Sequence, residues 1–186
     1  MCRRVSESLH RLSNTWVTLA AVVVFILFTA FVLPRQAATA ETYTRDAGSL
    51  DTSFFYSADD LYRIAGAYGE NGRRLYVRSR FTFDAIWPFV YAVFLTTAIS
   101  WIYRRAFVPR SRWRLANLAP LLAAGFDYLE NVSTSIVMLR YPARTPVVDR
   151  LAPFFTLSKW TLIGASFALL LTGVAVGIWR WVVRER

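Results

Sequence analysis

The sequence predicts an all-α membrane protein: a four-transmembrane-helix bundle with a small extracytoplasmic α/β cap formed by the first loop. Hydrophobic residues make up 55% of the 186 residues and aromatic residues 16%, which is more than a soluble domain of this length needs. Four long apolar runs account for the excess. Each reaches the roughly 18 to 20 residues that cross a hydrocarbon layer about 30 Å thick, so a soluble fold is excluded.

The four predicted spans follow one another in a single polytopic membrane domain, residues 1–186. The first and second runs, about 16–33 and 85–103, carry no charge. The third, about 117–139, contains two acids, and the fourth, about 153–179, contains one lysine. The side chains of Asn117 and Asp84 are predicted to cap the N-termini of the third and second spans, and the alternative for Asp84 is a role at the mouth of an intramembrane cavity.

Basic residues beside the spans set the predicted orientation. Arginines crowd the N-terminal segment, the loop at 104–114 and the C-terminus, whereas residues 34–84 balance seven arginines with seven acids. We therefore expect both termini in the cytoplasm. Of the 22 basic residues 21 are arginine, a bias typical of a GC-rich genome, and so we expect the inner membrane of a bacterium. The net charge of +10 then indicates lipid headgroups as partner rather than nucleic acid.

The beginning of the chain allows an alternative interpretation. Arginines, an apolar run and the small-residue sequence Ala38-Thr39-Ala40 together resemble a signal peptide that is cut after Ala40. The 18-residue apolar run exceeds the usual signal length, which favours an uncleaved anchor.

The first outer loop, residues 34–84, is long enough to fold into the cap. Ser57 and Asp60 have the spacing of a capping box ahead of an amphipathic helix over 58–68, which Gly69 is predicted to end.

The remainder of the cap is predicted as a hairpin. Asn71-Gly72 indicates a turn, and apolar and polar residues alternate from Leu75 to Phe83, as in a strand. Residues 52–56 are a possible partner strand. The alternative is a helix that runs straight from the cap into the second span.

The third span carries polar residues that cannot face lipid. Asp127, Glu130, Asn131 and Thr134 have the spacing i, i+3, i+4 and i+7, which places them on one helical face near the predicted bilayer midplane. Lys159 in the fourth span is the predicted partner of the two acids. One amine neutralises only one carboxylate, so the second acid must be protonated or meet another cation.

Further residues are expected to complete this cluster. Arg80, Arg78 or Arg140 is expected as a second cation, and Tyr91 is expected to donate a hydrogen bond to the acids. The predicted ligand-binding set is therefore Asp127, Glu130, Asn131, Thr134, Lys159, Tyr91 and Arg80.

Cysteine and histidine counts exclude several chemistries. Cys2 and His10 each stand alone, so the chain has no disulfide, thiolate metal site or bis-histidine haem. We expect no metal and no cofactor, and nothing in the sequence indicates nucleotide binding.

The cluster supports three functional hypotheses besides a purely structural polar core. The preferred one is non-catalytic binding of a membrane lipid or partner subunit, including a second copy of the chain, through an outward-facing cluster. The alternative is a small membrane enzyme acting on a lipid-like substrate, with Asp127 or Glu130 as general acid or base and Lys159 as the positioning cation. The third is a proton or ion pathway.

Overall fold

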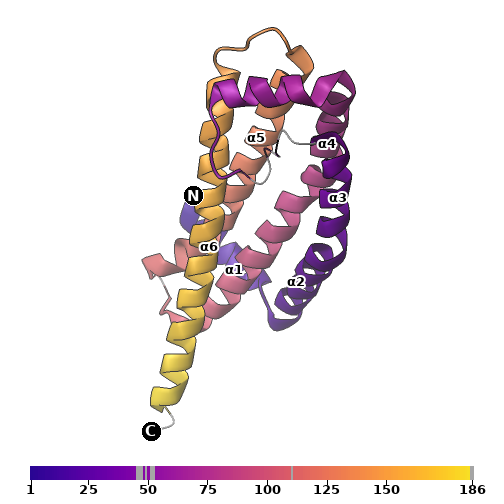
Figure 1. Ribbon diagram of the computed structural model, residues 1–186. Coiled ribbons are helices and arrows are strands. Elements are labelled where there is room, and N and C mark those ends of the chain that lie inside the picture. Colours follow the sequence, from indigo (N-terminus) through magenta and orange to yellow (C-terminus); the bar gives the residue numbers. More distant parts are fainter. Residues whose placement is uncertain (45–47, 49, 51–52, 110, 185–186) are drawn as a thin grey trace. The chain divides into compact units, whose positions relative to one another are not determined.

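The computed structural model describes residues 1–44, 48, 50, 53–109 and 111–184, and the regular secondary structure of these residues is helical throughout. In chain order the elements are α1 (Cys2–Leu12), α2 (Thr15–Leu27), the π-helix η1 (Phe28–Val32), α3 (Leu33–Thr44), α4 (Ala58–Ala106), the 3-10 helix η4 (Arg112–Leu118), α5 (Ala119–Arg140) and α6 (Val148–Arg184) (Figure 1).

Among the residues that the structure describes, three helical stretches are long and apolar enough to cross a membrane: Thr15–Thr44, Ala58–Ala106 and Val148–Val183. They contain the first, second and fourth predicted spans. The third predicted span forms α5, which has 22 residues but is not among these stretches. Its acids, amide and hydroxyl groups lower its mean hydropathy, so the predicted count of four spans is not supported by the helices themselves.

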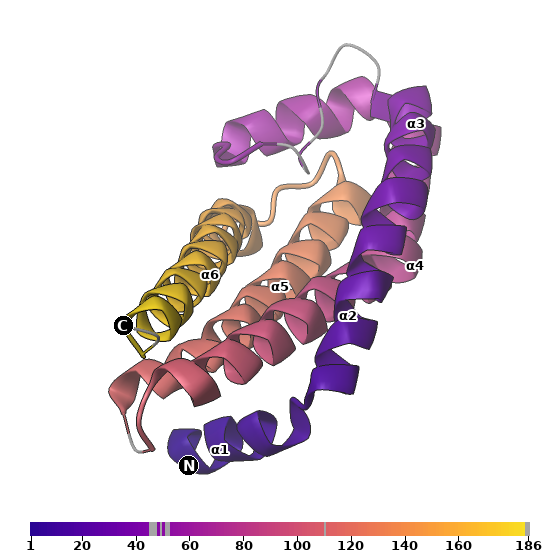
Figure 2. The ribbon, with the colours of Figure 1, turned by 90° about the horizontal axis from the view of Figure 1, so that it is seen from below.

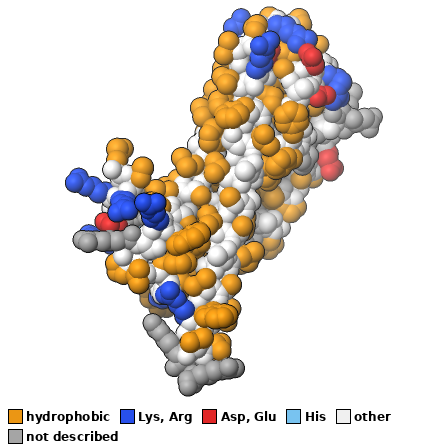
Figure 3. Space-filling model, turned by 90° about the vertical axis from the view of Figure 1, so that its left-hand side faces the viewer, with side chains coloured by type: hydrophobic (Ala, Val, Ile, Leu, Met, Phe, Trp, Pro, Cys, Tyr) orange, Lys and Arg blue, Asp and Glu red, His pale blue; other side chains and the backbone are white. Residues whose placement is uncertain are grey.

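Large apolar side chains cover the outside of the apolar helices. In the most apolar part of Thr15–Thr44 only 6% of residues are buried, and Trp16 and Phe31 are 78% and 60% exposed. Figure 3 shows apolar side chains spread over much of one face, whereas basic side chains gather in separate groups. Such a surface is stable against lipid tails rather than water, which marks the chain as a membrane protein.

The helices α2, η1 and α3 follow one another without a break in helical structure (Figure 2). Pro34 has no backbone N–H to donate, and the π-helical turn Phe28–Val32 directly precedes it. The widened turn accommodates the proline without ending the helix. The sequence Ala38-Thr39-Ala40, considered above as a cleavage site, lies within α3.

The start of α4 confirms the predicted capping box. The Ser57 hydroxyl accepts a hydrogen bond from the Asp60 amide at 3.1 Å, and the Asp60 carboxylate accepts one from the Ser57 amide at 3.1 Å. Gly69 has φ 65° and ψ 178°, a conformation that only glycine adopts readily, and it breaks the helix where predicted. Figure 1 shows the segment before Gly69 turning away from the rest of α4.

The α/β character of the cap was predicted wrongly. Residues 75–83 are helical and continue into the second span, which is the alternative that the sequence left open. Alternation misled because the buried side of this helix carries a charged residue and its exposed side an apolar one: Arg80 is 4% exposed whereas Phe81 is 61% exposed. Of the proposed partner segment 52–56, residues 53–56 are neither helix nor strand, and residue 52 lies outside the described residues.

Two predicted helix caps are also corrected. Asp84 does not cap the second span, because it lies inside the continuous helix α4. Asn117 does not cap the third span, because α5 begins at Ala119 after η4. The Asn117 side chain instead donates to the Ser6 carbonyl at 3.2 Å and to the Ser100 hydroxyl at 2.9 Å.

The chain forms two compact units, residues 1–26, 89–123 and 161–186 in the first and 27–88 and 124–160 in the second. In the first unit, Gly173 of α6 lies against Tyr103 of α4, whose hydroxyl donates to the Leu169 carbonyl at 2.8 Å. The rings of Phe25 and Phe94 stack with their centroids 4.3 Å apart.

The second unit has a core rich in tyrosine. Its buried aromatic members are Tyr43, Tyr56, Tyr62, Tyr68 and Tyr76. Two of these hydroxyls illustrate how a buried tyrosine binds polar groups: the Tyr62 hydroxyl lies 3.1 Å from the Thr145 hydroxyl, and Thr156 donates to the Tyr56 hydroxyl at 3.0 Å. This core fixes the ends of α4, α5 and α6 that carry the polar cluster.

Candidate functional site

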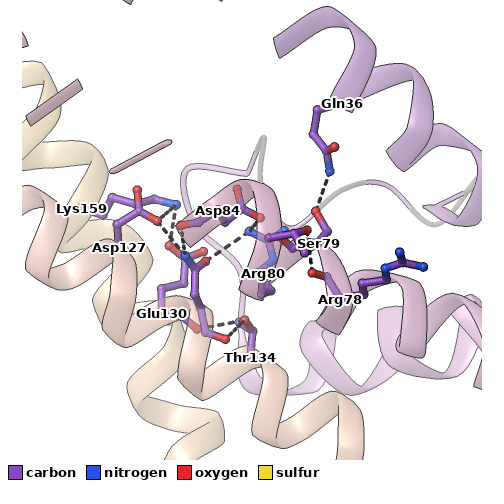
Figure 4. A network of polar contacts seen from close by, with 11 residues as sticks. Gln36, Arg78, Ser79, Arg80, Asp84, Asp127, Glu130, Thr134 and Lys159 are labelled. Atoms are coloured by element: carbon purple, nitrogen blue, oxygen red, sulfur yellow. Dashed lines mark hydrogen bonds and ion pairs between the residues drawn. The ribbon is translucent and has the colours of Figure 1, made fainter. Parts of the chain in front are cut away.

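Charged side chains from α4, α5 and α6 meet in the interior of the second unit (Figure 4). Arg80 and Asp84 come from α4, Asp127 and Glu130 from α5, and Lys159 from α6. We call these five residues, with Asn131 of α5, the ion network.

Lys159 contacts both acids of α5. Its Nζ lies 2.6 Å from Oε2 of Glu130 and 3.8 Å from Oδ1 of Asp127. The pair with Glu130 is therefore a close ion pair, and the contact with Asp127 is longer. The sequence predicted this meeting of the single lysine with the two acids, and the structure contains it.

Arg80 is the second cation of the ion network. Its Nη1 lies 3.0 Å from Oδ2 of Asp84, one helical turn away, and donates to Oδ1 of Asn131 at 3.3 Å. Its guanidinium group lies over the Tyr76 ring, 4.3 Å from the centroid. The aromatic face and the carboxylate together hold a cation that is 4% exposed.

Asn131 joins the two halves of the ion network. Its amide nitrogen donates to the Asp84 carbonyl at 3.3 Å and lies 3.5 Å from Oδ1 of Asp127. Its amide oxygen accepts from Arg80. One side chain on α5 therefore fixes α4 and the acid–lysine pair at once.

Every member of the ion network is buried. The exposed fractions run from 1% for Glu130 to 9% for Asp84. The network contains three carboxylates and two basic groups, which gives a formal excess of one negative charge when all are ionised. Burying charged groups is costly, and ion pairs and hydrogen bonds within the network offset part of that cost.

The other predicted site residues have different surroundings. Thr134 is buried, but its hydroxyl donates to the Glu130 carbonyl of its own helix at 2.9 Å. Tyr91 is buried and belongs to the first unit. Arg78 is exposed and its side chain points away from the ion network (Figure 4), and Arg140, the last residue of α5, is exposed.

Asp84, predicted as a helix cap or as a residue at the cavity mouth, lies beside Arg80 in the ion network, and the contact of Tyr76 with Arg80 was not predicted. Both lie on the face of α4 that also carries Arg80, at the helical spacing 76, 80 and 84. That spacing was visible in the sequence, but the strand prediction concealed it. A third contact was also missed: Gln36 of α3 donates to the Ser79 hydroxyl of α4 at 2.6 Å (Figure 4).

Comparisons with protein families, with curated proteins and with solved structures find no match to this chain. Within the described part of the chain, no group of three or more His, Cys, Asp or Glu side chains is placed to hold a metal ion. The function of the chain is therefore inferred from the geometry and charge of the site itself.

Proposed function

We propose that the protein binds a membrane ligand, a lipid or a partner subunit, through its ion network, without catalysing a reaction. The charge count carries this proposal: three buried carboxylates share two buried cations. A ligand that brings one cationic nitrogen would balance the site. The ammonium of an aminophospholipid headgroup and a lysine or arginine on a partner helix both have this chemistry.

The surface beside the ion network suits such a ligand. Phe81 of α4 and Val132 of α5 are 61% and 46% exposed, so apolar side chains flank the site. One turn along each helix from these side chains, the Tyr128 hydroxyl of α5 donates to the Ala85 carbonyl of α4 at 2.9 Å. A lipid or partner helix would lie along this surface. Its cationic group would reach the ion network after the hydrogen bond between Tyr128 and Ala85 breaks.

Contacts within the second unit suggest the depth of the site. The Phe28 ring stacks on Phe83 and Trp87, with centroids 5.6 and 5.5 Å away, and Gln36 reaches Ser79. The turn from Arg80 to Asp84 thus lies beside the end of the first apolar run. We therefore place the ion network toward the outer edge of the hydrocarbon layer, within reach of headgroups, rather than at its midplane.

The same proposal includes a fourth membrane crossing by α5. A helix of 22 residues is about 33 Å long at 1.5 Å per residue, which is enough to cross. Its acids lie in the ion network, and the exposed side chains of Leu122 and Leu129 supply a lipid-facing surface. With arginines at 104, 105, 112 and 114 on the inner side, both termini lie in the cytoplasm of a bacterial cell, and the chain resides in its inner membrane.

The geometry favours binding over the two other hypotheses. An acid/base enzyme needs a carboxyl group that reaches its substrate, whereas Glu130 is 1% exposed and closely paired with Lys159. A proton or ion pathway needs a polar route on both sides of the site. The exposed surface at Phe81, Leu129 and Val132 is apolar.

Native mass spectrometry of the protein in mild detergent tests the proposal. The wild-type protein is reconstituted with equal amounts of phosphatidylethanolamine and phosphatidylglycerol and then compared with Asp127→Asn, which removes the excess charge. We expect the wild type to retain the aminophospholipid, or a second subunit, and the variant to lose it. Glu70→Gln is the control, because Glu70 is 72% exposed and outside the ion network.

Thermal unfolding separates lost binding from lost folding. Without ligand, Asp127→Asn is expected to be at least as stable as the wild type, because it relieves the excess of negative charge. An empty wild-type monomer, or a variant that retains the same bound mass as the wild type, would contradict the proposal.

A further inference from the structure

The first unit contains a basic pocket that is separate from the ion network. It has a volume of about 300 Å³ and lies between α1, the end of α4 and η4. Its lining residues are Glu7, His10, Arg11, Arg104, Pro109 and Arg114. Three arginines face one glutamate, so the lining carries a formal excess of two positive charges with His10 neutral.

The backbone around the pocket is held rigidly. The two ring nitrogens of His10 lie 2.9 Å from the Ser100 carbonyl and 3.0 Å from the Arg114 carbonyl. The Ser6 hydroxyl donates to the same Arg114 carbonyl at 3.1 Å. These contacts fix α1 against both α4 and η4, so the pocket is formed before any ligand arrives.

The arginine side chains retain donors for a ligand. Arg104 uses Nη1 to donate to the His10 carbonyl at 3.0 Å, and a guanidinium group has five N–H donors in all. Nε of Arg114 is buried and has no hydrogen-bond partner among the described residues. A buried donor of this kind costs free energy until an acceptor satisfies it. Arg11, which is exposed, adds a third guanidinium group at the mouth.

We propose that this pocket binds a phosphate group. Guanidinium groups match the tetrahedral oxygens of phosphate with paired, charge-assisted hydrogen bonds, and three of them line one cavity here. The pocket volume is at the lower end of the range for small-ligand sites, which suits a headgroup rather than a large cofactor.

The position of α1 favours the phosphate of an anionic phospholipid. Val5 and Leu12 lie two helical turns apart on α1 and are 42% and 69% exposed, so this helix presents an apolar face beside its arginines. Arg104 directly follows the apolar part of α4. A basic pocket between helices at this level is where an anionic headgroup meets the protein.

Matched double variants test the proposal. Arg11→Gln with Arg114→Gln removes two arginines from the pocket, and Arg4→Gln with Arg112→Gln removes two exposed arginines of the same helices that do not line it. Both variants have the same net charge. Each full-length protein is reconstituted with a mixture of phosphatidylglycerol and phosphatidylcholine, and retained phosphatidylglycerol is measured by native mass spectrometry.

We expect the pocket variant to retain phosphatidylglycerol about tenfold less than wild type, since lost phosphate contacts weaken binding, and the control variant to change it less than about twofold. Equal losses in the two variants would overturn the proposal, because diffuse attraction by surface charge would explain them. A pocket variant that still retains the lipid would overturn it as well.

Inorganic phosphate distinguishes the two sources of the group. If millimolar phosphate stabilises the lipid-free wild type but not the pocket variant, and phosphatidylglycerol shows no preference, the ligand is a soluble phosphate compound. If phosphatidylglycerol is retained in the presence of phosphate, the ligand is the lipid headgroup. If neither probe distinguishes the pocket variant from the control, the proposal is wrong.

Discussion

Replacing Lys159 with methionine is the sharpest perturbation of the ion network. Methionine keeps the length of the side chain but removes the charge that lies 2.6 Å from Glu130 and 3.8 Å from Asp127. Both acids are at most 5% exposed, so water cannot replace the lost cation without rearrangement. Removing one partner of a buried ion pair costs about 3–5 kcal/mol.

The size and pH dependence of this loss follow from the proton that the variant must bind. At an ordinary carboxyl pKa near 4.3, protonating an acid at pH 7 costs about 3–4 kcal/mol, and at pH 5 about 1 kcal/mol. The destabilisation of Lys159→Met is therefore expected to be largest near neutral pH and to shrink as the pH falls toward 5. Adding Glu130→Gln to Lys159→Met returns the ion network to the wild-type excess of one negative charge and is expected to restore most of the lost stability at pH 7.

The pair between Arg74 and Glu70 is the matched control. Its atoms are also 2.6 Å apart, but the two side chains are 74% and 72% exposed. Arg74→Gln is expected to cost less than about 1 kcal/mol at any pH. Tryptophan fluorescence during thermal unfolding in detergent compares the variants. Equal effects of Lys159→Met and Arg74→Gln, or a loss independent of pH, would refute the electrostatic reasoning.

Two further predictions concern the first unit. Gly173→Leu is expected to destabilise it by about 1–3 kcal/mol in thermal unfolding, because a Cβ there would lie 2.5 Å from the Tyr103 ring, whereas Gly177→Leu meets open space and is expected to change little. For His10, burial lowers the pKa below 6.5, and two nearby arginines add to this effect while two backbone carbonyls oppose it. His10 therefore binds a proton more tightly when α1 is undocked than when it is docked. The contribution of His10 to docking is fully present above about pH 6.5 and is lost as the pH falls below it. Hydrogen exchange of the amides in residues 2–12, corrected for the intrinsic effect of pH, measures this loss, and His10→Gln is expected to remove it. Unchanged protection of α1 between pH 8 and 5 would contradict the sign of this argument.

The predictable parts of the fold were those that depend on local chemistry. The first, second and fourth apolar runs became the three stretches able to cross a membrane, because length and hydropathy decide that property. The capping box of Ser57 and Asp60 and the break at Gly69 were also correct, since each needs only a few neighbouring residues. The third predicted span is not among these stretches, because its polar residues lower its mean hydropathy.

The prediction for residues 75–83 failed because alternation assumes that apolar side chains point inward. In a lipid environment the apolar side can be the outer one, and here Phe81 is exposed while Arg80 is buried. Only the positions of α5 and α6, which tertiary packing sets, show that Arg80 has partners inside. The sequence of residues 75–83 alone does not show which helices pack against them.

The acid–lysine contact followed directly from the sequence, whereas the choice of Arg80 over Arg78 and Arg140 as the second cation did not. Lys159 is the single lysine of a chain with acids inside a neighbouring apolar run, so elimination alone pairs them. Arg80 is one of 21 arginines. Choosing it required knowledge of which residues of α4 lie level with the acids of α5. Asn131 of α5 sets this alignment, because it hydrogen-bonds both to the Asp84 carbonyl and to the Arg80 guanidinium group.

The same bonds explain why charge rather than shape defines the site. Asn131 fixes the register of α4 against α5, so Arg80 stays beside Asp84 and does not move to pair with Asp127 or Glu130. Lys159 is held by its 2.6 Å contact with Glu130. Among the described residues of the ion network the acids therefore outnumber the basic groups because of how the helices pack, and under the proposed function a cation from the ligand balances this excess.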